Sequence, residues 1–150
     1  MADVRVVQTD EQRRDAFAVR HAVFVEEQGV PEELELDEHD DAATHFVAYD
    51  EGEAVGAARL RRYGGDSDTA DAPPTAKVER VAVLEARRGE GWGRRLMDCL
   101  EATARERGYD RLTMHSQTHA AGFYEQLGYE RHGAEFEEAG IPHVEMRKRL

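Results

Sequence analysis

The sequence predicts an α/β fold of the α+β kind, in which helices flank a largely antiparallel central sheet. Three observations lead to this fold class. The expected order is strand, helix or helices, three strands, helix, strand, helix and two strands, which is not the regular alternation of a doubly wound sheet. Residues 50–53 read as a tight turn that joins two strands in a hairpin. The length of 150 residues fits one core, so we expect a single domain over residues 1–150.

The first half of the chain predicts a strand, a helix and a hairpin. Thr9 followed by Gln12 is typical of a capped helix start, so we expect the helix to begin near Asp10. Gly29 and Pro31 should end it. Bulky residues at helical spacing predict its buried stripe: Phe17, His21 and Phe24. Runs of apolar and β-branched residues predict the strands, over residues 4–7, 44–49 and 54–61.

The second half predicts two further helices and four strands. Residues 63–75 contain Gly-Gly and Pro-Pro pairs without apolar periodicity, so we expect a surface loop. A helix should begin near Gly93 and end before Gly108, and a short one should cover residues 119–128. The longer helix has an apolar face made by Leu96, Leu100 and Ala104. The strands are expected over residues 77–83, 112–115, 129–136 and 143–149.

The composition is strongly acidic and argues against several classes of partner. The chain has 20 basic and 32 acidic residues, a formal net charge of −12, which repels nucleic acid. No stretch is apolar enough for a membrane span and the N-terminus lacks a signal pattern, so we expect a cytoplasmic protein without a membrane partner. Acidic residues dominate residues 32–41, which we interpret as solvated surface. Such a surface is typical of a salt-loving source.

The sharpest local motif is a glycine-rich turn between a predicted strand and a predicted helix. Arg88-x-x-Gly91-x-Gly93 places glycines where the backbone can approach an anion and where a helix N-terminus supplies free N–H groups. A P-loop is excluded because no Gly-Lys-Ser/Thr triplet occurs, and a dinucleotide fingerprint fails because Arg94 stands where it needs glycine. A turn that only joins the strand to the helix remains the alternative.

This turn, with residues 79–83 before it, resembles the acyl-CoA site of the GNAT superfamily of N-acetyltransferases. A second motif follows in the right order, because residues 121–129, Ala-Gly-Phe-Tyr-Glu-Gln-Leu-Gly-Tyr, resemble the family's Phe-Tyr-x-x-Leu-Gly-Phe/Tyr segment. Residues 20–28 and 140–146 are similar to the ends of the ElaA-like branch. The resemblance therefore covers most of the chain.

The resemblance implies a splayed V between the strand ending at Val83 and the strand ending at Ser116, with the pantetheine arm of acetyl-CoA in the gap. Backbone groups of Val81 and Val83 would hold that arm. The family often has Asn after the second strand, where this chain has Gln117 or His119. The residues expected to bind acetyl-CoA are Val81, Ala82, Val83, Arg88, Gly89, Glu90, Gly91, Trp92, Gly93 and Arg94.

Acyl transfer to an amine needs an oxyanion donor, an acid for the leaving thiolate and a route for the amine proton. By resemblance, the donor is the backbone N–H of Val81 and the acid is Tyr124, whose alternative role is that of a core residue with its hydroxyl at the surface. Strand alternation puts Lys77, Glu79, Val81 and Val83 on one face, which makes Glu79 a candidate base. A salt bridge to an arginine is the competing role of Glu79. The other candidate bases are Glu27, His115 and ordered water.

The sequence therefore predicts an acetyl-CoA-dependent N-acetyltransferase that acts by direct attack in a ternary complex. The acceptor would be a small-molecule or protein amine, and a homodimer is left open. A non-catalytic acyl-CoA sensor and an interaction protein that uses the fold as a scaffold are the alternatives. The histidines form no dense ligand cluster such as His-Glu-x-x-His, so we expect no metal site.

Overall fold

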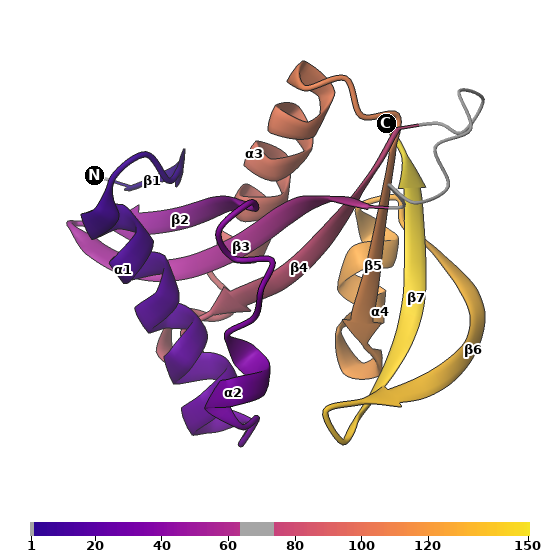
Figure 1. The fold of residues 1–150 in the computed structure, drawn as a ribbon, viewed down its shortest axis with the longest axis horizontal. Helices are drawn as coiled ribbons and strands as arrows, with labels where there is room; N and C mark the ends of the chain where they lie inside the picture. The colour runs from indigo at the N-terminus through magenta and orange to yellow at the C-terminus, as the bar shows by residue number, and fades with distance from the viewer. Residues whose placement is uncertain (1, 64–73) are drawn as a thin grey trace.

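The computed structural model describes residues 2–63 and 74–150 of the chain (Figure 1). Its strands are β1 Ala2–Val6, β2 Thr44–Asp50, β3 Glu53–Tyr63, β4 Thr75–Val83, β5 Arg111–Gln117, β6 Glu130–Glu138 and β7 Ile141–Arg149. Its helices are α1 Asp10–Arg20, the π-helix η1 His21–Glu27, α2 Glu32–Glu35, α3 Trp92–Glu106 and α4 Ala121–Gln126, with short 3-10 turns at η3 Glu85–Arg87 and η4 Thr118–Ala120.

The described strands form one seven-stranded sheet in the order β1-β2-β3-β4-β5-β7-β6. The neighbouring strands pair antiparallel except for β4 and β5, which run parallel. Helices α1 and α2 cover one face, and α3 and α4 cover the other (Figure 1). This arrangement confirms the predicted α+β class with a largely antiparallel sheet.

The N-terminal helix starts as expected but buries a different stripe. The Thr9 side chain accepts a hydrogen bond from the backbone N–H of Gln12, which satisfies a free donor of the first turn. The predicted stripe of Phe17, His21 and Phe24 is only partly buried. The residues that fill the core under this helix are smaller: Ala16, Val19 and Val23. Phe17 and Phe24 pack against this core from its edge, so the stripe prediction was right about the side of the helix and wrong about which residues fill the centre.

Helix α3 supplies the larger core on the opposite face of the sheet. Leu96, Leu100 and Ala104 are all completely buried, as their spacing predicts. They pack with strand residues such as Leu60 and Val78 in one cluster that extends to α4. Burial of this helix fixes the position of its N-terminus beside the end of β4.

The strands around residues 64–73 are longer than the sequence indicated. Tyr63 and Thr75 were expected in a loop, yet they pair with each other as the last register position of β3 and β4. The rest of the predicted loop lies outside the described residues.

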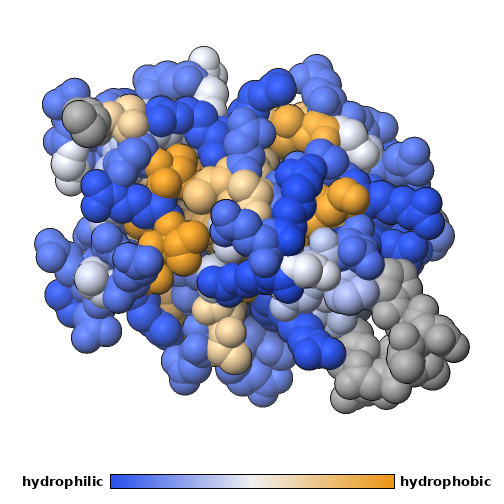
Figure 2. Space-filling view, turned by 90° about the horizontal axis from the view of Figure 1, so that it is seen from above, coloured by the Kyte–Doolittle hydropathy of each residue, from blue (hydrophilic) through white to orange (hydrophobic). Residues whose placement is uncertain are grey.

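Figure 2 shows one face of the molecule, on which hydrophilic residues surround small separate groups of apolar ones. Within residues 2–63 and 74–150, every helix is too short or too polar to cross a membrane.

Candidate active site

A cavity of about 530 Å³ lies where β4 and β5 separate. The two strands pair at four positions, of which Val78 with Met114 is the last. Beyond it β4 continues to Val83 and β5 to Gln117 without pairing with each other, so the strands diverge as the arms of a V (Figure 1). Residues of η1, α2, α4 and the β6–β7 turn complete the walls of the cavity. The expected splayed V is confirmed.

A bulge in β4 lies at this cavity. Between Ala57 and Arg59 the register advances two residues on β3, but it advances three on β4, from Ala82 to Glu79. Arg80 carries the distortion with φ +57°, a left-handed conformation that is rare for a residue with a long side chain. An extra residue in a strand shifts the alternation of side chains across the sheet.

The bulge overturns the predicted alternation along β4. Lys77, Glu79, Val81 and Val83 were placed on one face by counting in twos. In the structure Val81 and Val83 pack against the core under α3, whereas Ala82 belongs to the core under α1. Glu79 contacts the charged groups on the α1 side. The prediction that Glu79 shares a face with Val81 was therefore wrong, because the residue between them adopts the bulge conformation.

The carboxylate of Glu79 is held by three cations. Its Oε1 accepts hydrogen bonds from Arg59 at 2.9 Å and from the Nε of Arg61, and Lys77 lies 3.7 Å from Oε2. Burial by itself would raise the pKa of this carboxyl, but these cations outweigh burial and the pKa lies below its ordinary value. Glu79 thus makes the salt bridges that the sequence analysis left as its competing role.

Arg59 connects Glu79 to a buried ion network that holds α2 against the sheet. The guanidinium of Arg59 is completely buried and also binds Asp37 and Asp40. Buried Arg20 binds Asp40 and Glu35 in the same way. The acidic segment 32–41 was expected to be solvated surface; that interpretation is wrong for Glu35 and Asp40, which are 3% and 5% exposed. They are buried because arginines from distant elements neutralise them.

The glycine-rich turn leads into α3 with open space around its backbone. Gly89 has φ +81° and Gly91, the N-cap of α3, has φ +89°, conformations that favour glycine. A Cβ at either position would meet no atom within 4 Å. The N-cap makes no side-chain hydrogen bond to the helix, so the first-turn N–H groups at Trp92, Gly93 and Arg94 are available to an anion.

The side chains of this turn have structural roles of their own. A Cβ at Gly93 would lie 3.1 Å from the Phe123 ring, so glycine lets α3 and α4 pack closely. Trp92 is buried and its Nε1 donates to Glu90. Arg94 is exposed on the first turn of α3. The backbone, more than these side chains, faces the open space.

Arg88 spans the gap between the turn and η1. Its guanidinium donates to both carboxylate oxygens of Glu27, at 2.6 and 2.7 Å, and its Nε donates to the carbonyl of Val83. The hydrogen bonds from Arg88 keep the pKa of Glu27 below its ordinary value. Glu27, an alternative base in the sequence analysis, is therefore engaged in a bidentate ion pair.

Tyr124 lies on α4 and borders the cavity. Its side chain is 7% exposed, and its ring meets Phe123 and Tyr129 edge to face at 5.0 and 5.8 Å between centroids. Among the described residues, no group accepts a hydrogen bond from its hydroxyl. Burial raises the pKa of Tyr124 well above its ordinary value.

A pair of glutamines connects the β5 arm to the end of η1 at one side of the cavity. The Gln117 amide donates to Gln28 at 2.8 Å, and Gln28 donates back at 3.3 Å. His119 Nε2 lies 2.6 Å from Gln117 Oε1. Gln117 and His119, the two residues expected near the position at which the family often has Asn, thus contact each other, and the Gln117 amide is already bonded to Gln28.

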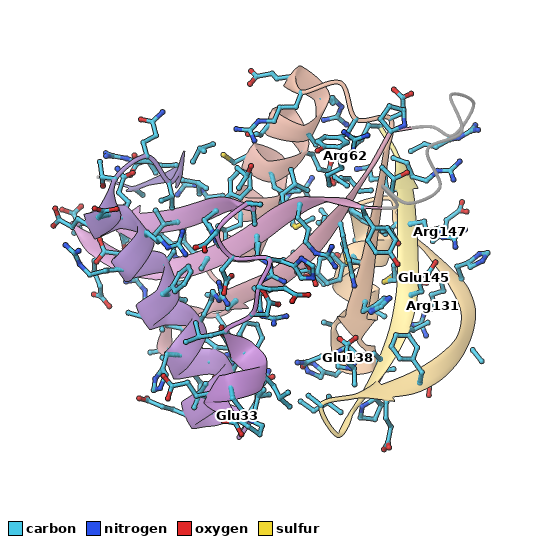
Figure 3. All side chains as sticks on the ribbon, viewed as in Figure 1. Glu33, Arg62, Arg131, Glu138, Glu145 and Arg147 are labelled. Atoms are coloured by element: carbon cyan, nitrogen blue, oxygen red, sulfur yellow. The ribbon has the colours of Figure 1, made fainter. Side chains whose placement is uncertain are left out.

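The β5 side of the cavity carries a cluster that includes one residue the sequence analysis missed. His115 Nδ1 lies 3.0 Å from Oε1 of Glu138, whose Oε2 lies 3.8 Å from Nε2 of His143. Glu138 extends from the end of β6 toward β5 (Figure 3). A lone glutamate in an acidic strand gives no sequence signal, and only the pairing of β5, β7 and β6 brings it beside His115.

Comparisons with known proteins agree with this architecture. The model of the acetyltransferase (GNAT) domain matches residues 7–150, so the chain belongs to the GNAT acetyltransferase family. The Bacillus subtilis protein YjcF, described as an uncharacterized N-acetyltransferase, is 40% identical over 144 residues, which cover 95% of this chain and 96% of that protein. A crystal structure from Lactobacillus plantarum has a TM-score of 0.85 at 32% identity, covering 99% of this chain and 98% of that one.

Escherichia coli ElaA is a further structural relative. Its crystal structure has a TM-score of 0.80 at 27% identity and covers 99% of each chain. The resemblance to the GNAT superfamily, with ElaA among the relatives, is confirmed.

Proposed function

We propose that the protein transfers an acetyl group from acetyl-CoA to a primary amine by direct attack in a ternary complex. One observation carries the proposal: Val81, Ala82 and Val83 line the cavity between the diverging strands, and the chain then runs through a glycine-rich turn with an open backbone into the N-terminus of α3. Parting strands expose unpaired backbone groups for an extended pantetheine arm, and the helix N-terminus suits a pyrophosphate. Membership of the acetyltransferase family supports the same reaction.

The donor would be held mainly by backbone groups. N–H groups from Gly89 to Arg94 would bind the pyrophosphate, and those of Val81 and Val83 would bind the pantetheine arm. The bulge at Arg80 supports this arrangement, because it turns Val81 and Val83 toward the core under α3, the helix that begins at the glycine-rich turn. By family resemblance, the N–H of Val81 would also stabilise the oxyanion.

Tyr124 would protonate the leaving thiolate. The phenol borders the cavity, carries its proton at neutral pH as an ordinary tyrosine does, and is not committed to another acceptor among the described residues. A proton held at this oxygen suits a thiolate that forms only as the C–S bond breaks. The core role that the sequence left open is partly fulfilled too, since the ring packs among aromatic residues while the hydroxyl borders the cavity.

The test combines binding with turnover. Calorimetry should detect acetyl-CoA binding, and a panel of small amines and peptides should include acceptors that release free CoA thiol and gain an acetyl group by mass spectrometry. Binding without product for any amine would favour the acyl-CoA sensor. Absence of acetyl-CoA binding would favour the scaffold role and contradict the proposal.

A further inference from the structure

Two titratable side chains stand opposite each other at the vertex of the V. Val78 and Met114 form the last pair of β4 and β5, and both belong to the core under α3. The next residues, Glu79 and His115, therefore project to the opposite face, and both line the cavity. An amine that enters from this side would meet one group or the other.

Glu79 and His115 differ in the number of charged partners that their side chains contact. Glu79 is surrounded by three cations, which lower the affinity of its oxygens for a proton. The imidazole of His115 contacts one carboxylate, that of Glu138 at 3.0 Å, and its ring lies edge to face with Phe136 at 4.9 Å. Among the described residues, nothing else hydrogen-bonds to the imidazole of His115.

The contact with Glu138 determines which nitrogen of His115 is available. An ionised carboxylate only accepts hydrogen bonds, and the hydrogen bond from His115 keeps the pKa of Glu138 below its ordinary value. The Nδ1 atom must then carry the proton, which leaves the lone pair of the neutral ring on Nε2. The Phe136 contact restrains the plane of the ring.

We propose that His115 is the general base of the transfer and that Glu138 is its positioning residue. The inference rests on the proposed function and replaces Glu79 as the expected base. The amine nitrogen forms a bond to the thioester carbonyl carbon, the C–S bond breaks, and the amine proton passes to Nε2 of His115. Tyr124 gives its proton to the departing sulfur. The imidazolium then returns a proton to solvent and the phenolate takes one, so charge and atoms balance.

The charged environment of His115 comes from three neighbouring strands. Register and contacts place these charged and titratable groups on its side of the sheet: Lys77 and Glu79 on β4, His132 and Glu138 on β6, and His143, Glu145 and Arg147 on β7. Of these, only Glu138 lies within hydrogen-bond distance of the imidazole. Substitution of Glu138 can therefore separate the effect of this hydrogen bond on His115 from the effect of the more distant charges.

The first experiment replaces the base. His115→Gln should slow acetylation at neutral pH by about 100-fold or more, the range of general base catalysis, with recovery at higher pH as the amine deprotonates in bulk. Acetyl-CoA affinity by calorimetry should stay at the wild-type value. His132→Gln, which is exposed on β6, is the matched control and should leave both quantities unchanged. His115→Ala should regain activity when imidazole is added.

The second experiment tests the positioning residue by a readout other than turnover. Nitrogen-15 NMR of the wild-type protein should show His115 as the Nδ1–H tautomer, and Glu138→Gln should convert it to a tautomer mixture and slow acetylation by about 10-fold. Glu137→Gln, the exposed neighbour, should change neither.

The outcomes separate this inference from the proposed function. An undiminished rate with an unshifted pH profile in His115→Gln, while the wild type acetylates amines, would overturn the inference alone, and so would wild-type-like tautomer and rate in Glu138→Gln. A wild-type protein that binds acetyl-CoA and acetylates no amine would overturn both. If His115→Gln fails to fold, Glu138→Gln and the imidazole experiment decide.

Discussion

The two arms of the V share a cavity but are built differently. The β4 arm, residues 79–83, is fixed by a buried ion network around Arg59 and by a bulge at Arg80. The β5 arm, residues 115–117, is bordered by the β6–β7 turn, whose half-exposed Glu138 lies 3.0 Å from His115 and 3.8 Å from His143. The charged side chains of the β4 arm each have several partners, whereas Nε2 of His115 on the β5 arm has no hydrogen-bond partner among the described residues.

This difference indicates a division of labour. A multiply paired carboxylate such as Glu79 is a poor proton acceptor and a good anchor, so the β4 arm suits the binding of a donor in a fixed position. A histidine with one oriented nitrogen suits proton transfer, so the β5 arm suits catalysis. The four predictions below test this division, together with the acidic surface that both arms share.

The largest effect is expected at the glycine-rich turn beside the β4 arm. Gly91→Leu should abolish detectable acetyl-CoA binding, because the side chain would enter the open space next to the first-turn N–H groups of α3. Gly108→Leu is the matched control: it has φ +83°, has no atom within 4 Å of its Cβ position and follows the other end of the same helix. Both variants should lose stability through strain, but only the first should lose binding by calorimetry.

The second largest effect is expected on turnover when Tyr124, the proposed general acid, is replaced. Tyr124→Phe should reduce turnover by about 100-fold with acetyl-CoA affinity nearly unchanged, because the hydroxyl acts only as the thiolate forms. Tyr129→Phe is the control, since that hydroxyl donates to buried Glu101 at 2.8 Å and should affect stability rather than rate. Equal turnover in Tyr124→Phe and the wild type would assign protonation to solvent or another residue.

A smaller effect is expected at Glu79 on the β4 arm. Glu79→Gln should lower the free energy of unfolding by about 1–3 kcal/mol, because Arg59 loses part of its compensation, and should leave the pH–rate profile unshifted. The folded-state pKa of Glu79 lies below the ordinary 4.5, so its stabilisation is present above that value and is lost as the pH falls.

Acid unfolding curves check this second consequence. The variant should lose less stability on acidification than the wild type, because it no longer has this carboxylate to protonate. A rate that falls at neutral pH and recovers at high pH in Glu79→Gln would instead return the base to the β4 arm.

The smallest effect concerns the whole surface. At a net charge of −12, self-repulsion should destabilise the protein in dilute buffer, and screening should relieve it. The melting temperature by calorimetry should therefore rise by several degrees in molar sodium chloride. Equal melting temperatures in dilute buffer and in molar salt would contradict the idea of a salt-adapted surface.

Local signals in the sequence predicted most of the fold. Thr9 and Gln12 give the start of α1, and Leu96, Leu100 and Ala104 give the buried face of α3, because capping and helical periodicity depend on residues close in the chain. The glycine-rich turn was located for the same reason: glycine is needed where the backbone has positive φ.

The details of the site depend on contacts between residues that are distant in the sequence. The alternation of residue types along a strand and the composition of a segment do not reveal such contacts. An arginine in a strand does not indicate a bulge, so the bulge at Arg80 was not predicted. Regular alternation along β4 therefore placed Glu79 on the wrong face. Asp40 was expected to be solvated surface, but in the structure it accepts hydrogen bonds from Arg20 and Arg59, which are distant in the sequence. Glu138 reaches His115 only through the pairing of three strands.

The central claim is that this cavity carries acetyl transfer to an amine, and transfer of an isotopic label tests it most directly. The protein should be incubated with acetyl-CoA labelled in the acetyl group and an amine panel, and the products analysed by mass spectrometry. The account predicts labelled acetyl-amine in amounts equal to the free CoA thiol released, with both products lost in Gly91→Leu and retained in Gly108→Leu. Labelled product that forms equally in Gly91→Leu, or acetyl-CoA binding without labelled product from any amine, would contradict it.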